Sequence, residues 1–208
     1  MFLVMQGSMV SYVYTDGSCR GNGKSRPCAG IGVYFGEGDP RNVSKRIDGK
    51  QTNNVAELSA IIEAFSIIEK DLLCGREYVV VTDSEYVIKC VNSYGRRCAQ
   101  NGWLKNIPNK QLVRQAYHMY EPFSNVSFMH VMAHTNDDTA HARGNAAADR
   151  LANQGATSSP LLSRPVRVDL KVPYARKEEA KELGARWDPS AKTWYTTGDH
   201  PLLIERFI

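Results

Sequence analysis

The segment VYTDGSCRGNG, residues 13–23, joins the end of an apolar strand to a run of small, turn-forming residues, with Asp16 at the junction. An aspartate at a strand end is most simply a turn residue, because its side chain accepts hydrogen bonds from nearby backbone amides. Asp16 alone therefore indicates no chemistry. Its meaning depends on whether other acidic residues occupy comparable positions in the rest of the chain.

Strand and helix patterns surround this segment. Three short strands are predicted in VSYVYTDG, AGIGVYFG and VSKRID, because Gly, Pro and Asp residues separate them. The segment TNNVAELSAIIEAFSIIEK is predicted to be a helix, since Leu58, Ile61 and Phe65 recur at helical spacing. The apolar strand REYVVVTD, the helical segments SEYVIKCVNSYGRRCAQNGW and PNKQLVRQAYHMY, the strand NVSFMHVMAH and the helix RGNAAADRLANQ follow. This order predicts an α/β fold, a mixed five-stranded sheet with helices on both faces.

The chain is predicted to contain two folded units. Residues 1–8 are interpreted as an N-terminal extension and residues 9–155 as the α/β domain. The segment GATSSPLLSRP is small, polar and interrupted by proline, which is typical of a linker, placed at residues 156–165. Residues 166–208 are expected to form a small α+β module. Its aromatic residues are most simply explained as its core: Tyr174, Trp187, Trp194 and Tyr195.

Composition limits the classes of protein that this chain can represent. Its 208 residues carry a formal net charge of +4, which permits a polyanionic partner without requiring one. No apolar run reaches membrane-spanning length, and the opening MFLVM is too short for a signal peptide. The five cysteines form no CxxC pair, which favours free thiols in a reducing compartment. We therefore expect an intracellular monomer, in the cytoplasm or the nucleus.

Three further acids occupy positions comparable to that of Asp16. Asp83 ends the apolar strand YVVVTD, Glu57 lies beside the apolar stripe of its helix, and Asp149 is flanked by alanines that let a helix approach a sheet closely. Carboxylates at the edge of a core are unfavourable unless a cation compensates them, and converging carboxylates raise one another's pKa values. Divalent ions remove both penalties, and oxygen ligands favour Mg²⁺ or Mn²⁺ over zinc.

The motifs YTDGSCRGNG, TNNVAELSA, VVTDSEYV, NGW and GNAAADRLA have the order and spacing found in the type 1 ribonucleases H, which cut the RNA strand of RNA–DNA hybrids. The chain resembles that family from about residue 9 to residue 154. The resemblance implies a ribonuclease H-like sheet and endonucleolytic hydrolysis with two Mg²⁺ ions, for which Mn²⁺ can substitute, leaving 5′-phosphate and 3′-hydroxyl ends. It places the catalytic, metal-binding acids at Asp16, Glu57, Asp83 and Asp149.

The resemblance also implies which residues contact the RNA–DNA hybrid. The 2′-hydroxyl is the group that marks a ribose, and the family reads it with residues corresponding to Cys19, Gly21, Asn22, Asn53 and Asn54. The TNN segment is equally typical of a helix cap. Residues corresponding to the DNA-strand contacts are Lys50, Thr52, Asn109, Tyr94, Arg96 and Arg97. A solvated helix face is the alternative for the basic segment, and Trp103 is expected in the core.

The loop AHTNDDTAHARGN follows the last strand of the predicted domain. The resemblance places at His134 a catalytic histidine that assists proton transfer or product release. The loop adds Asp137, Asp138 and His141; the acids are most simply a solvated loop tip, and His141 is a second candidate for the histidine.

The C-terminal unit resembles a small module of unknown function found on primase- and topoisomerase-like proteins. We expect it to bind nucleic acid or another protein.

Two alternatives to a ribonuclease H stay open. One is another nuclease of the same fold class, such as a resolvase or a transposase-like enzyme, which the SCRGN and TNN segments disfavour because they suit ribose recognition. The other is a non-catalytic hybrid-binding protein, which four intact acids disfavour.

Overall fold

The computed structural model describes residues 10–23, 25–132, 138–158, 167–197 and 206–207. The chain divides into two compact units, one ending at Ser158 and one beginning at Ser159. Within the described residues, no helix combines the length and the apolar character needed to cross a membrane. The predicted N-terminal extension lies outside the described residues.

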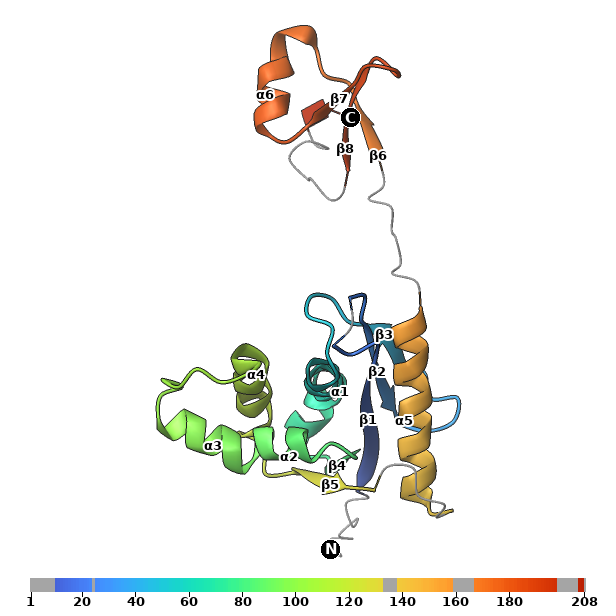
Figure 1. The fold of residues 1–208 in the computed structure, drawn as a ribbon, viewed down its shortest axis with the longest axis vertical. Helices are drawn as coiled ribbons and strands as arrows, with labels where there is room; N and C mark the ends of the chain where they lie inside the picture. Colours follow the sequence, from blue (N-terminus) through green and yellow to red (C-terminus); the bar gives the residue numbers. More distant parts are fainter. Residues whose placement is uncertain (1–9, 24, 133–137, 159–166, 198–205, 208) are drawn as a thin grey trace, which may run out of the picture. The chain divides into compact units, whose positions relative to one another are not determined.

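The first unit is built on a mixed sheet of five strands, as the sequence predicts (Figure 1). Its order is β3-β2-β1-β4-β5, in which β1–β2 and β2–β3 are antiparallel while β1–β4 and β4–β5 are parallel. The buried strand β1 therefore lies at the centre, where its residues can meet groups from both faces. The strands are β1 (Ser11–Arg20), β2 (Cys28–Tyr34), β3 (Val43–Arg46), β4 (Tyr78–Thr82) and β5 (Val126–His130).

Helices cover both faces of this sheet, with α5 on the opposite side from α1–α4 (Figure 1). The segment of residues 84–103, expected to be largely helical, forms two helices, because the backbone at Asn92 (φ −110°, ψ −105°) leaves the helical region between them. The last helix extends to Thr157, two residues into the expected linker, since Ala156 is buried and the Thr157 hydroxyl donates to the Asn153 carbonyl. The helices are α1 (Asn53–Leu73), α2 (Glu85–Val91), α3 (Ser93–Gln100), α4 (Lys110–Tyr120) and α5 (Ala140–Thr157).

The larger core lies between the sheet and helices α1 and α4. Val80 of β4, Ile61 of α1 and Val113 of α4 are all fully buried in it. Trp103 is only 7% exposed and packs in the same cluster, which confirms its expected place in the core.

On the other face, α5 lies unusually close to the sheet. A Cβ at Gly32 of β2 would overlap the carbonyl oxygen of Ala148, so only glycine at this position lets α5 approach the strand this closely. The buried Ala148 and Ala152 supply the matching small surface of the helix. This close approach, predicted from the alanines, brings Asp149 to the edge of β1.

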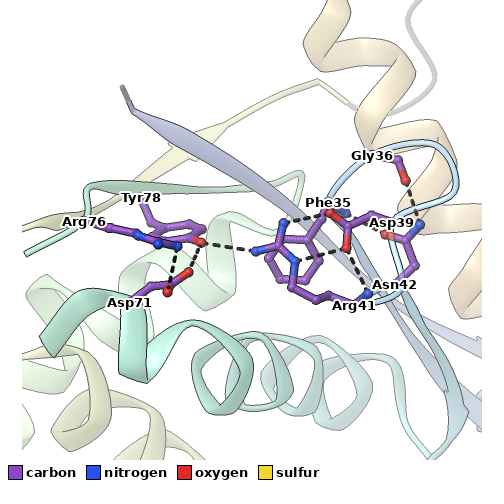
Figure 2. Close-up of polar contacts among 8 residues, drawn as sticks. All are labelled: Phe35, Gly36, Asp39, Arg41, Asn42, Asp71, Arg76 and Tyr78. Carbon is purple, nitrogen blue, oxygen red and sulfur yellow. Dashed lines mark hydrogen bonds and ion pairs between the residues drawn. The ribbon is translucent and has the colours of Figure 1, made fainter. Parts of the chain in front are cut away.

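A polar network ties the start of β4 to the end of α1 and to the loop between β2 and β3 (Figure 2). The buried Tyr78 hydroxyl donates to Asp71 Oδ2 at 2.6 Å and accepts from Arg41 Nη1 at 3.3 Å. Arg41 in turn pairs with Asp39 at 2.7 Å, and Arg76 pairs with Asp71 at 3.0 Å. Burial, with the hydrogen bond to Asp71, raises the pKa of Tyr78, so its hydroxyl stays a donor. The network stabilises the end of β4 remote from Asp83.

Replacing Tyr78 with Phe is expected to lower the free energy of unfolding by about 1–2 kcal/mol, because a buried hydroxyl with two partners is removed. Urea unfolding measures the change. Tyr12→Phe is the matched control, since the Tyr12 side chain is 38% exposed. Equal stability of the two variants would contradict the role assigned to the network.

The second unit is a small α+β module with a three-stranded antiparallel sheet of order β6-β8-β7. Leu170, Ala180, Ala185 and Phe207 form its core, with Trp194 packed against them. The expectation that all four aromatic residues form the core is wrong for Tyr174, which is 82% exposed, and for Trp187, which is 47% exposed. Its elements are β6 (Arg167–Leu170), η1 (Tyr174–Arg176), α6 (Lys177–Glu182), β7 (Arg186–Asp188) and β8 (Thr193–Thr197).

Candidate active site

Four acids from four separate elements line one pocket of about 470 Å³. Asp16 lies in β1, Glu57 in the second turn of α1, Asp83 directly after β4 and Asp149 in α5. One oxygen from each of Asp16, Glu57 and Asp83 lies within 4.8 Å of the others. The structure therefore brings together the four acids that the sequence singled out.

Close packing of α1 on β1 places Glu57. The Thr52 hydroxyl caps the helix by accepting from the Val55 amide at 3.4 Å, so α1 begins directly after it. A Cβ at Gly17 would overlap the backbone nitrogen of Glu57, and only glycine lets the helix approach the strand at this point. The cap and the glycine together fix the Glu57 carboxylate beside Asp16.

The pocket concentrates negative charge away from water. Asp16 and Glu57 are each 6% exposed. Burial, with Asp83 and Asp149 nearby, raises the pKa of Asp16 to about 7. Burial and the Asp16 charge also raise the pKa of Glu57 well above its usual range. The described lining of the pocket includes no lysine or arginine, so a bound cation is the natural counter-charge.

The donor set fits a hard divalent ion. All the charged ligand atoms offered are carboxylate oxygens, which suit Mg²⁺ or Mn²⁺ and do not suit a thiophilic metal. Asp16 lies at the centre of this set, because its carboxylate is within 4.8 Å of those of Glu57 and Asp83, and because Asp149 is close enough to raise its pKa.

Two asparagines of α5 hold the carboxylates and were not predicted from the sequence. Asn153 Nδ2 donates to Asp149 Oδ1 at 2.8 Å, while its Oδ1 accepts from the Ser18 hydroxyl at 2.8 Å. Asn145, which is 5% exposed, donates to Asp83 Oδ2 at 3.1 Å. The spacing of Asn145, Asp149 and Asn153, four residues apart on one helix face, is the signal that could have revealed them.

Asn153→Ala is expected to weaken Mg²⁺ binding at the acidic pocket by about tenfold or more, because losing a partner of a metal ligand typically weakens metal binding to that extent. A calorimetric titration of the protein with Mg²⁺ measures the effect. Gln154→Ala, on the exposed neighbouring position, is the control. An unchanged Mg²⁺ affinity would show that Asn153 does not position Asp149.

The residues proposed to contact RNA lie near the pocket or on adjoining turns. Asn53 lines the pocket at the start of α1, and Asn54 beside it is exposed. Gly21 has a left-handed backbone (φ 68°), which forms the turn that presents the exposed Asn22. Cys19 is half-buried in β1. Thr52, and not an asparagine of the TNN segment, is the helix cap.

The residues expected to contact DNA are divided between two places. Lys50 and Thr52 lie just before Asn53 of the acidic pocket, whereas Tyr94, Arg96 and Arg97 belong to α3. Tyr94 and Arg97 line a small pocket of about 220 Å³ between α3 and the loop that follows it. Asn109 has a left-handed backbone (φ 54°) at the start of α4, and its Nδ2 donates to the Tyr86 hydroxyl at 3.5 Å. Exposed positive charge beside these residues comes from Lys50, Arg96, Arg97 and Lys105.

The histidine loop is described in part. His134 and Asp137 lie outside the described residues, so the role of His134 stays a prediction. Asp138 pairs with Arg143 at 2.7 Å, and both side chains are exposed, as expected of a loop tip. His141 Nδ1 lies 3.2 Å from the Tyr14 hydroxyl, and His141 is not among the described residues that line the acidic pocket.

Comparison with known proteins places both units. The profile of the RNase H family matches residues 9–157, and that of a domain of unknown function (DUF5710) matches residues 167–202. Human Ribonuclease H1 is 35% identical over 150 residues, which make up 71% of this chain and 50% of the human protein. The chain thus spans about half the length of this relative.

This chain matches a larger share of two further relatives than of the human protein. Ribonuclease H of Clostridium botulinum (strain Hall) is 31% identical over 151 residues, which make up 68% of this chain and 92% of the bacterial protein. The crystal structure of LC9-RNase H1, a type 1 RNase H with the type 2 active-site motif, superposes with a TM-score of 0.53 at 28% identity, covering 72% of this chain and 73% of that one. With the fold and the four acids in place, these matches show that the chain belongs to the RNase H family.

Proposed function

We propose that this protein is an endonuclease that hydrolyses the RNA strand of RNA–DNA hybrids and uses two Mg²⁺ ions, with Mn²⁺ as a substitute. The convergence of Asp16, Glu57, Asp83 and Asp149 in one pocket supports this proposal most strongly. Membership of the RNase H family supports the choice of substrate. The products expected are 5′-phosphate and 3′-hydroxyl ends.

The chain's own residues would hold and orient the reacting groups. Bound divalent ions supply charge stabilisation at the scissile phosphate and an activated water. Asp16 would hold both ions, with Asp149 completing one site and Glu57 and Asp83 the other. Asn153 and Asn145 fix the orientation of two of these carboxylates through hydrogen bonds. The chemistry needs no covalent enzyme intermediate.

Selection for RNA would come from the 2′-hydroxyl. Asn53 lines the pocket, so its amide can reach a ribose whose phosphate lies against the acids. Asn22, Asn54, Gly21 and Cys19 are the other proposed contacts on this strand. We place the DNA strand against Lys50, Thr52, Asn109 and the exposed Arg96 and Arg97, with Tyr94 beside them. We also propose that His134 assists proton transfer or product release.

One assay separates the proposal from its alternatives. With Mg²⁺ present, we expect cleavage of an RNA–DNA hybrid and at least about 100-fold slower cleavage of double-stranded RNA, branched DNA and a hybrid carrying 2′-deoxy substitutions around the cut. Cleavage of branched DNA alone would indicate a resolvase-like nuclease. Binding of the hybrid without any cleavage would indicate a non-catalytic protein.

A further inference from the structure

The C-terminal module carries an open groove of about 600 Å³ at the edge of its core. Two exposed aromatic rings and two lysines are among the residues that line it: Tyr174, Trp187, Lys171 and Lys192. We propose that this groove binds single-stranded DNA, through stacking of bases on the rings and pairing of phosphates with the lysines.

The two rings are presented for stacking in different ways. Trp187 of β7 lies directly opposite Trp194 of β8, with ring centroids 5.4 Å apart. Trp194 packs against the module's core, so it supports Trp187 from the inside while 47% of Trp187 remains exposed. Tyr174, at the start of η1, is 82% exposed. Stacking on such rings tolerates any base, because every base has a flat face.

In the described part of the module, the groove carries positive charge, whereas the acids named below pair with arginines outside it. Asp169 and Asp188 both pair with Arg167, and Glu179 pairs with Arg176 and Arg206. Within the described part of the module, Lys171 and Lys192 form no ion pair, and no acid lines the groove. The Lys177 ammonium lies 4.2 Å above the Tyr174 ring and adds to the positive charge there. Unpaired cations next to exposed rings fit a single-stranded polyanion better than an apolar peptide.

The choice of DNA rests on the proposed function. When the RNA strand is cut, its fragments leave, whereas the DNA strand stays intact. A module that held RNA would be released with the product, but one that holds the DNA strand keeps the catalytic unit on the same substrate through effective concentration.

Strand alternation supplies a matched control. Arg186 and Trp187 are successive residues of β7, so their side chains point to opposite faces of the sheet. Arg186 does not line the groove, although it carries the same charge as Lys192. Lys192 has a left-handed backbone (φ 50°), which glycine adopts without strain, so Lys192→Gly removes the charge while keeping the turn.

The test is fluorescence anisotropy of a 12-nucleotide oligothymidine probe with the full chain in EDTA at several salt concentrations. We expect Tyr174→Ala to weaken binding by at least about fivefold. Lys192→Gly should weaken it and make the salt slope shallower by about 0.7, as loss of one single-strand phosphate contact does. Arg186→Ala should leave the slope at its wild-type value.

Equal binding by the wild type, Tyr174→Ala and Lys192→Gly proteins would overturn the proposal, as would no binding by the wild type. Tighter binding of an oligouridine probe than of oligothymidine would overturn the assignment to DNA. Hybrid cleavage by the wild type in Mg²⁺ is measured separately. The anisotropy assay requires no catalysis. A groove that does not bind DNA and a protein that lacks the proposed ribonuclease activity therefore give different results.

Discussion

Purified Asp16→Asn protein is expected to cleave an RNA–DNA hybrid at least about 10³-fold more slowly than the wild type, because it loses the ligand proposed to serve both ions, and each is worth several kcal/mol in the transition state. Asp16 is only 6% exposed, and it lies within 4.8 Å of both Glu57 and Asp83, so no water-exposed carboxylate can replace it at that point. Asparagine keeps the shape of the side chain and removes its charge.

Hybrid binding should survive this substitution, because the proposed binding surface lies on other residues, among them Asn54, Arg96 and Arg97. Single-turnover cleavage in Mg²⁺ and hybrid affinity in EDTA are the two measurements. Asp138→Asn is the matched control, since Asp138 is exposed and pairs with Arg143. Ca²⁺ should not support cleavage in the wild type, given its looser coordination geometry. Residual turnover of Asp16→Asn within tenfold of wild type would reject the assignment.

Much of the first unit could be predicted from sequence because its signals are local. Turn residues separate the strands, apolar spacing marks α1, and the alanines of α5 indicate its close approach to the sheet. The acids could be found because each follows or borders an apolar segment. The helical pattern of residues 84–103 did not locate the break at Asn92, although Asn92 and Ser93 are turn-favouring residues and Gly95 follows closely.

The features that could not be predicted from the sequence depend on contacts between residues far apart in the chain. The link from Ser18 through Asn153 to Asp149 joins positions 135 residues apart, so neither residue attracts notice alone. The aromatic residues of the module were expected inside, because a small unit commonly uses its largest side chains as core. Phe207, from the end of the chain, fills that place together with Ala180 and Ala185, so Tyr174 and Trp187 are left at the surface.

The same Asp16→Asn substitution is expected to stabilise the metal-free protein at pH 8. Burial and the neighbouring acids raise the pKa of Asp16 from 3.8 to about 7 in the folded state. Between these values the folded protein holds a proton that the unfolded chain has lost, so the free energy of unfolding falls as pH rises from about 4 to about 7. Above that range the ionised Asp16 destabilises the fold by up to about 4 kcal/mol.

Urea unfolding in EDTA at pH 4 and pH 8 tests this linkage. Asp16→Asn should match the wild type at pH 4, where Asp16 is protonated, and exceed it at pH 8, while Asp138→Asn should follow the wild type at both. Mg²⁺ at pH 8 should then raise the stability of the wild type more than that of the variant, since binding to the folded state adds to its stability. A variant no more stable than wild type at pH 8 would mean that the acids do not repel one another. Opposite effects on stability and cleavage would show that Asp16 is kept for the ion it holds, at a cost to the metal-free fold.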